Sequence, residues 1–291
     1  MFPPRSPCFP SFCTSLYNEG MYTLGKVDNM ERVCRAPWNC YVPPIQMGPH
    51  VWYVSGNDWV ASYLIDTGDG LVLIDTAMHE SLYLLLENIH RLGYDPHEIK
   101  VILLSHAHND HIGGAKALKE LTGAKLYLGK GDLYFLHERP DLVLSQGYTC
   151  GLFEPDGLYD DETPIRIGNA VFHTTGTPGH TPGCTSFRFE QDGLVYAMHG
   201  GLGFNTMSKD YFDFAGLPYS LVDDFYAGLK KLDGWKVDIA LPSHTNQIRI
   251  LEKRDRAGKE PNPYLDPEAW HVLLKERMQR TEPLLKEKAT W

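Results

Sequence analysis

The chain has 291 residues, of which 43% are hydrophobic, which suffices for one large globular domain or two small ones. No apolar run approaches the roughly 20 residues of a transmembrane helix, so we expect no membrane span. The formal net charge of −10 argues against a nucleic-acid partner, because phosphate backbones are bound by basic surfaces.

The N-terminal segment is rich in proline and lacks the apolar stretch of a secretory signal. Residues 1–20 are therefore predicted to be disordered, and the protein to be cytoplasmic with reduced thiols. If any of the six cysteines form a local disulfide, Cys34 and Cys40 are the best placed. No linker divides the chain after residue 50, so residues 21–291 are predicted to form a single domain.

Beyond residue 50 the chain shows two series of strands and helices. The first series is predicted to have strands at 50–54, 61–66, 71–75, 101–104 and 125–128, and helices at 81–92 and 112–121. Asp69-Gly70, between the second and third of these strands, is typical of a β-hairpin turn.

The second series is predicted to have strands at 165–167, 170–175, 185–189, 194–198 and 237–241, and helices at 221–232 and 266–286. In the last helix, Asp266 is expected to be the N-cap, Pro267 to occupy the first helical position and Pro283 to break the final turns. Each series ends near a loop that carries histidine. We therefore predict an α/β fold with two sheets packed face to face and helices outside, an αββα sandwich.

The densest group of potential ligands directly follows the apolar strand 101–104. His106, His108, Asp110 and His111 fall within six positions. Imidazole nitrogens and a carboxylate oxygen suit Zn²⁺. A helix cannot aim all four at one point, because its neighbouring side chains are three or four residues apart, but a tight turn at a strand end can. A single histidine in a polar turn is usually just solvated, whereas a cluster of three histidines and an aspartate favours a metal site.

Two further histidines stand in loops that follow predicted strands. His180 lies in a turn bracketed by Gly179 and Gly183, and His244 follows the strand at 237–241. Either histidine alone would be interpreted as an ordinary surface or core residue. Because loops at one end of a sheet can converge, the cluster at 106–111 makes both of them candidate ligands.

In order and spacing, these motifs resemble the metallo-β-lactamase superfamily over roughly residues 50–250. The runs Gly56 to Leu64, Leu103 to His108 and Ala170 to Gly183, with the long terminal helix, are most similar to the third subclass of metallo-β-lactamases. The resemblance implies a metallo-β-lactamase-type αββα catalytic domain with two zinc ions. The first ion would be held by three histidines, His106, His108 and His180. The second would be held by an aspartate and two histidines, Asp110, His111 and His244. Asp75 matches an aspartate that supports the ligands.

The chemistry follows from that ligand set. Two zinc ions roughly 3.5–4 Å apart can share a water and lower its pKa toward neutrality, which supplies hydroxide at physiological pH. One ion would polarise the scissile carbonyl and the other would receive the leaving group. Asp110 is expected to orient the nucleophile and take a proton from it, so its loss should reduce both metal binding and rate.

One position departs from the pattern. Most hydrolases of the superfamily, such as glyoxalase II and the lactonases, carry a metal-bridging aspartate after the strand at 194–198, where this chain has His199. The missing carboxylate argues against those branches. The third lactamase subclass usually has serines nearby that help to bind a β-lactam carboxylate, and these are missing too. His199 is equally well interpreted as an extra metal ligand, a substrate contact or neither.

The first functional hypothesis is a dinuclear zinc hydrolase that cleaves a β-lactam amide in a small-molecule substrate, an antibiotic-resistance activity. The alternative is a zinc-dependent hydrolase of another small ester, lactone or amide with little or no lactamase activity, which the missing secretory signal favours. Diiron oxidoreductases of the superfamily tend to have a carboxylate at the position of His108, so its imidazole argues against redox chemistry. Six intact ligands and the acidic charge argue against a non-catalytic or RNA-processing member. The oligomeric state is not predicted.

Overall fold

The computed structural model describes residues 29–143 and 151–291, so the predictions for residues 1–20 lie outside the described residues. The first sheet has seven strands in the order of the sequence. They are β1 (Ile45–Gly48), β2 (Val51–Tyr53), β3 (Tyr63–Asp66), β4 (Leu71–Ile74), β5 (Ile99–Leu103), β6 (Lys125–Leu128) and β7 (Gly157–Leu158). The pairs from β1 to β4 are antiparallel, and those from β4 to β7 are parallel.

The second sheet has five strands in the order β12-β11-β10-β9-β8. They are β8 (Ile165–Ile167), β9 (Ala170–Gly176), β10 (Thr185–Gln191), β11 (Leu194–Met198) and β12 (Ile239–Ala240). β8 to β11 form antiparallel pairs, whereas β12 runs parallel to β11 and requires a crossover that contains a helix.

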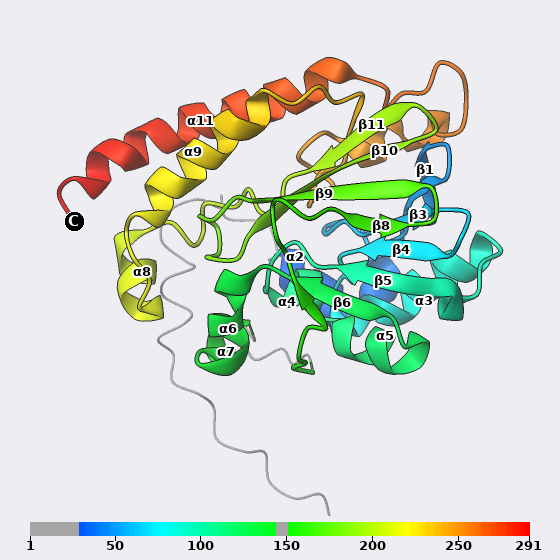
Figure 1. Cartoon of the computed structure of the whole chain (residues 1–291), viewed down its shortest axis with the longest axis horizontal. Helices are drawn as coiled ribbons and strands as arrows, with labels where there is room; N and C mark the ends of the chain where they lie inside the picture. Colours follow the sequence, from blue (N-terminus) through cyan, green and yellow to red (C-terminus); the bar gives the residue numbers. More distant parts are fainter. Residues whose placement is uncertain (1–28, 144–150) are drawn as a thin grey trace, which may run out of the picture.

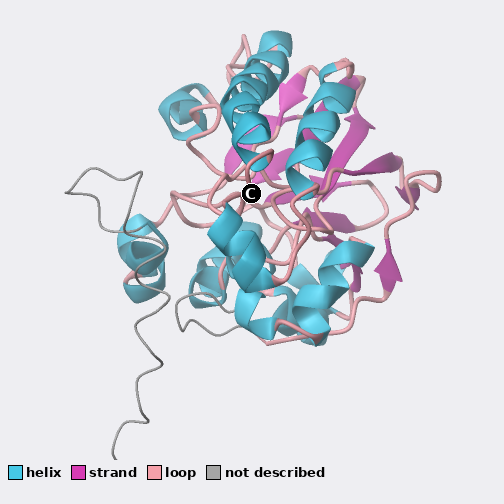
Figure 2. Cartoon of the chain, turned by 90° about the vertical axis from the view of Figure 1, so that its left-hand side faces the viewer, coloured by secondary structure: helices cyan, strands magenta, loops and turns pink. Residues whose placement is uncertain are grey.

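The described helices are α2 (Asn29–Arg35), α3 (Leu82–Arg91), α4 (Asn109–Ile112), α5 (Ala115–Thr122), α6 (Leu133–His137), α7 (Pro140–Val143), α8 (Lys209–Ala215), α9 (Leu221–Asp233), α10 (Ile250–Lys253) and α11 (Pro267–Lys288). In Figure 1, α9 and α11 lie side by side over β10 and β11, and α3, α4 and α5 lie beneath the first sheet. Figure 2 shows the strands between these two groups of helices.

Three buried clusters fill the space between the four layers. Val72, Phe172 and Phe187 belong to the cluster between the two sheets. A second cluster includes Leu85 of α3 and packs the lower helices on the first sheet, and a third includes Trp270 of α11 and packs the upper helices on the second sheet. Each sheet is thus apolar on both faces, which confirms the predicted αββα sandwich.

The structure corrects two details. The predicted helix at 112–121 is two helices, α4 and α5, which meet at Gly113-Gly114. Pro283 does not break the terminal helix, because α11 continues to Lys288 and its last turns pack Leu284 and Leu285 on the third cluster. As predicted, Asp266 is the N-cap of α11 and Pro267 is its first residue, although the Asp266 side chain makes no capping hydrogen bond. The strands β1 and β7 were not predicted, nor were the helices α2, α6, α7, α8 and α10.

Other expectations concern the thiols and the membrane. Cys40 keeps its thiol, to which Arg32 donates a hydrogen bond, so Cys34 and Cys40 are not joined.

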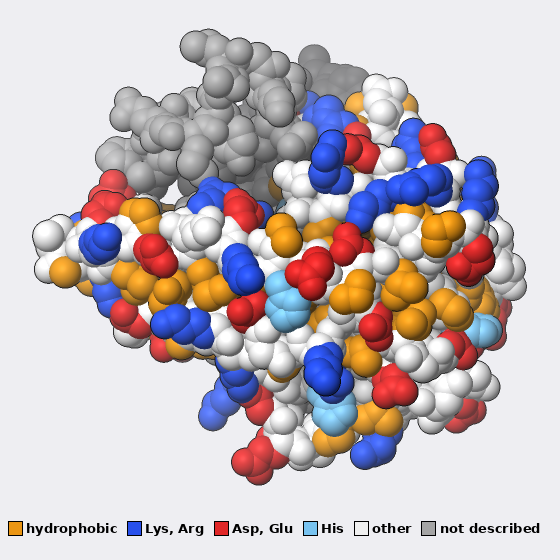
Figure 3. Space-filling view, turned by 90° about the horizontal axis from the view of Figure 1, so that it is seen from above, with side chains coloured by type: hydrophobic (Ala, Val, Ile, Leu, Met, Phe, Trp, Pro, Cys, Tyr) orange, Lys and Arg blue, Asp and Glu red, His pale blue; other side chains and the backbone are white. Residues whose placement is uncertain are grey.

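Within residues 29–143 and 151–291, no helix has both the length and the apolar composition needed to cross a membrane. Seen from above, the surface carries acidic and basic side chains together with hydrophobic ones (Figure 3).

Candidate metal centre

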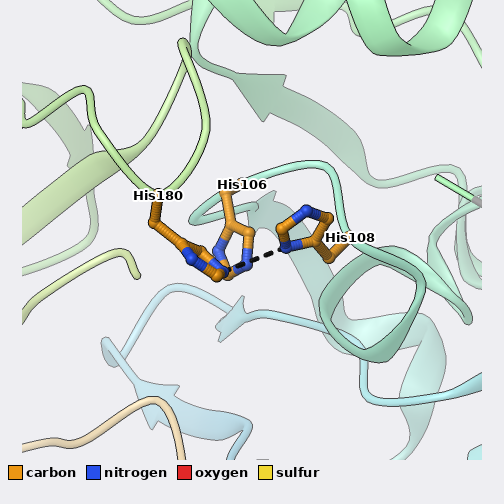
Figure 4. A group of neighbouring side chains, drawn as sticks. All are labelled: His106, His108 and His180. Carbon is orange, nitrogen blue, oxygen red and sulfur yellow. Dashed lines mark hydrogen bonds between the residues drawn. The ribbon is translucent and has the colours of Figure 1, made fainter. Parts of the chain in front are cut away.

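The six predicted ligand residues come together in two groups of three. The first group is His106, His108 and His180, and the second is Asp110, His111 and His244; within each group the potential ligand atoms lie within 4.8 Å of one another. In Figure 4 the rings of the first group point toward one another. The two groups adjoin, because the ring centroids of His106 and His111 are 4.1 Å apart.

Three separate segments of the chain carry these residues. His106 and His108 lie in the turn after β5, and Asp110 and His111 lie on the short helix α4, which begins directly after His108. His180 comes from the turn between β9 and β10. His244 follows β12 and forms an isolated antiparallel bridge with Val60, so pairing with the segment before β3 holds it in place.

The hydrogen bonds of the first group leave nitrogens available inside it. His180 Nδ1 lies 3.0 Å from the carbonyl oxygen of Gly203 and donates to it, so Nε2 keeps its lone pair. His180 Nε2 in turn lies 3.0 Å from His108 Nδ1. His106 Nε2 is buried without a hydrogen-bond partner in the structure. A buried nitrogen in this state is explained by a cation, and three imidazoles at this spacing fit Zn²⁺.

The second group combines a carboxylate with two imidazoles. Asp110 Oδ2 lies 3.5 Å from His111 Nε2 and 3.6 Å from His244 Nε2. Burial opposes the charge on Asp110, but His111, His244 and His108 together hold its pKa below the usual value. Burial also acts to lower the pKa of His111, but Asp110 and Asp75 raise it overall. This mixed nitrogen and oxygen set also fits Zn²⁺.

Burial keeps the other histidines of the two groups neutral, and the neutral form is the one in which imidazole binds metal. It lowers the pKa of His108 and of His244 to about 4. The pKa values of His106 and His180 are well below the usual value, chiefly through burial and then through neighbouring histidines.

Asp75 connects the two groups from behind. It directly follows β4, has its backbone in the left-handed region with φ of 56°, and is fully buried. Its carboxylate accepts hydrogen bonds from Ser105 N and Ser105 Oγ, each at 2.7 Å, and from His111 Nδ1 at 2.7 Å. Because Ser105 Oγ donates to Asp75, its oxygen is left to accept from His106 Nδ1 at 3.0 Å. One carboxylate therefore sets the ring orientation of one histidine in each group.

His199 directly follows β11 and belongs to neither group. It is 1% exposed, its ring centroid lies 6.0 Å from that of Phe225, and its Nδ1 accepts from Gly201 N at 3.2 Å. Burial, with a smaller effect from Arg277, lowers its pKa to about 3. Its Nε2 is buried without a hydrogen-bond partner in the structure.

Sequence reasoning missed several residues that contact the ligands. Thr206 Oγ1 lies 3.0 Å from His180 Nδ1, and the ring centroid of Trp59 lies 5.2 Å from that of His244. Asp132 is fully buried and bonds to both loops of the first group. Ser105 could have been found by its place beside His106. Asp132 and Thr206 lie more than 20 residues from the nearest ligand, and only the fold brings them there.

Comparison with known proteins agrees with this arrangement. Residues 58–197 match the family model described as the metallo-beta-lactamase superfamily. The uncharacterized protein YobT of Bacillus subtilis is 27% identical over 169 residues, which span 53% of this chain and 70% of YobT. A hydroxyacylglutathione hydrolase of Cereibacter sphaeroides is 34% identical over 95 residues, or 33% of this chain and 31% of that protein.

Among solved structures, BJP-1 is similar over most of its length. It is described as a subclass B3 metallo-beta-lactamase of Bradyrhizobium japonicum, and it superimposes with a TM-score of 0.77 at 27% identity, covering 87% of this chain and 97% of BJP-1. Fold, family model and similarity to BJP-1 agree with one another. The chain is therefore a metallo-hydrolase with the fold of the metallo-beta-lactamase superfamily, whose family model its residues 58–197 match.

Proposed function

We propose that this metallo-hydrolase holds two zinc ions and cleaves the amide bond of a β-lactam. The observation that carries the proposal is the pair of adjoining ligand groups, three histidines beside one aspartate and two histidines. The 27% identity to BJP-1 over almost all of that enzyme supports the lactam as substrate. His199 also supports the lactam as substrate, because it occupies the position at which the glyoxalase II and lactonase branches carry an aspartate.

In this proposal the histidines of both groups and Asp110 hold the metal. Bound zinc lowers the pKa of water toward neutrality and polarises a carbonyl group. Asp110 keeps a buried carboxylate beside His111 and His244, so it can orient the attacking water and accept a proton from it. Asp75 keeps His106 and His111 in the tautomers that leave Nε2 free.

A second candidate is hydrolysis of another small ester, lactone or amide with little lactamase activity. The 34% identity to a hydroxyacylglutathione hydrolase favours it, although that match covers only 31% of the relative. The two candidates share the ligand set and differ in the substrate.

The test is hydrolysis of a chromogenic cephalosporin by zinc-loaded protein, with a glutathione thioester assayed in parallel. We expect turnover of the cephalosporin that a chelator abolishes and that Asp110→Ala reduces at least about 100-fold, the size of a lost general acid–base contribution. Glu87→Ala, on the exposed face of α3, is the matched control and should leave turnover unchanged. Turnover of the thioester alone, by protein that holds two zinc ions, would overturn the lactamase proposal.

A further inference from the structure

Asp132 is a buried carboxylate that the reaction proposed above does not use. It ends the short turn Lys130–Asp132 before α6 and is fully buried. One oxygen, Oδ2, accepts from Ala107 N at 2.7 Å and from Thr181 Oγ1 at 2.9 Å. The other, Oδ1, accepts from Gly183 N at 2.6 Å. One side chain thus binds two loops that are more than 70 residues apart in the sequence.

Both loops carry ligands of the first group. Ala107 lies between His106 and His108, and Thr181 directly follows His180. The amide of Ala107 and the hydroxyl of Thr181 share a single oxygen atom. The separation between the turn after β5 and the turn after β9 is therefore set through Asp132, as well as through the packing of the two sheets.

Close backbone contact holds Asp132 in this position. A Cβ atom on Gly129 would lie 1.8 Å from the carbonyl oxygen of Gly183, and one on Gly183 would lie 2.4 Å from Asp132 N. Only glycine fits at either position. The turn that bears Asp132 is consequently pressed against the turn that bears His180, and the carboxylate has little freedom to move.

The choice of a carboxylate is costly for a structural contact. Burial raises the pKa of Asp132 to about 6, although the Ala107 and Gly183 amides and the Thr181 hydroxyl oppose that shift. A buried charge is expensive to desolvate, and a neutral side chain that only filled the space would avoid this cost. A carboxylate can accept from three donors at once, which a neutral amide in the same place cannot do.

We propose that Asp132 is a positioning residue that fixes the His106–His108 turn relative to the His180 turn, and so sets the geometry of the first metal site. The inference rests on the proposed function only in taking this group to be a metal site. It does not depend on which substrate is cleaved.

The test compares Asp132→Asn with wild-type protein by competitive zinc titration and by the visible spectrum after Co²⁺ substitution. Asparagine keeps the size but replaces one acceptor oxygen by a donor, so the amides of Ala107 and Gly183 cannot both be satisfied. We expect affinity at the first site to fall about 10- to 100-fold, the usual loss when a group that orients ligands is removed. The Co²⁺ spectrum of that site should change, while affinity at the second site stays the same.

Two further variants keep the test decisive. Thr181→Val removes one hydrogen bond to the shared oxygen and leaves both amide contacts, so we expect a loss of about threefold to tenfold, the equivalent of a single hydrogen bond. It also serves if Asp132→Asn fails to fold. Asp156→Asn is the matched control, because Asp156 accepts from Leu126 N at 2.8 Å in a different part of the fold, and both sites should be unaffected.

Hydrogen exchange separates this inference from the proposed function. In metal-free Asp132→Asn, the amides of Ala107 and Gly183 should exchange at least tenfold faster than in metal-free wild type. Unchanged exchange with unchanged zinc affinity would overturn the inference, as would a loss of stability with wild-type affinity at both sites. A wild-type protein that binds zinc but cleaves no substrate would overturn the proposed function alone. If wild type bound no zinc, the exchange rates would still decide whether Asp132 holds the two turns.

Discussion

At the scale of single residues, Asp75 is the side chain whose loss should affect both metal sites together. It orients His111 directly and His106 through Ser105. We expect Asp75→Ala to weaken zinc binding about 10- to 100-fold at each site. Competitive zinc titration measures this, with Glu120→Ala as the control, since Glu120 lies in an exposed ion pair with Lys116. A loss confined to one site would contradict the proposed linkage through Ser105.

His199 gives a second prediction at this scale. Because His199 lies outside both ligand groups, His199→Ala should bind as many zinc ions per chain as wild type, two in the proposed function. Metal analysis of dialysed protein decides the matter, with His180→Ala as the comparison that should lose an ion. A protein with one ion fewer after His199→Ala would identify His199 as the extra metal ligand.

At the scale of elements, α11 is held to the second sheet and to α9 by its buried stripe. Trp270 is 1% exposed, donates from Nε1 to the carbonyl of Leu232 at 3.0 Å and stacks on Trp235 at a centroid distance of 6.0 Å. Trp270→Ala should lower the free energy of unfolding by about 3–5 kcal/mol, the usual cost of a large aromatic cavity.

Urea denaturation measures that change as a lower midpoint at an unchanged slope. Val272→Ala, on the exposed side of the same helix, should change stability by no more than about 0.5 kcal/mol. Equal effects of the two substitutions would show that α11 is not anchored by this stripe.

At the scale of the whole molecule, metal would join the two halves of the sandwich. In the first group, His106 and His108 follow a strand of the first sheet, whereas His180 follows a strand of the second. Each ion at about 100 times its dissociation constant should add about 2.7 kcal/mol to the free energy of unfolding. A chelator should lower the melting temperature measured by calorimetry, and excess zinc should restore it. Magnesium should not, because it prefers oxygen ligands. A melting temperature that ignores both chelator and zinc would contradict this.

The fold class was predictable because the strands and helices of each layer have regularly spaced apolar residues in the sequence. The alternating apolar segments, the turn at Asp69-Gly70 and the apolar spacing of α3 and α9 are local signals, and they were confirmed. β1 was missed because its pairing with β2 stabilises it more than its own composition does. The prediction at Pro283 was wrong because packing of the last turns outweighs a missing backbone hydrogen bond.

The sequence by itself determined the chemistry of the centre, because three imidazoles and a carboxylate within one turn after a strand already restrict what can bind there. It also made His180 and His244 candidate ligands, because both lie in loops after predicted strands and the cluster at 106–111 favours a metal site. The division of the six residues into two groups was an expectation from the family resemblance, and the structure brings together the same two groups. Only the tertiary structure decided where His199 lies. It alone brought Asp132 and Thr206 beside the ligands. Hydrogen bonds between loops depend on the distance between strands in two separate sheets, and no local pattern of residues encodes that distance.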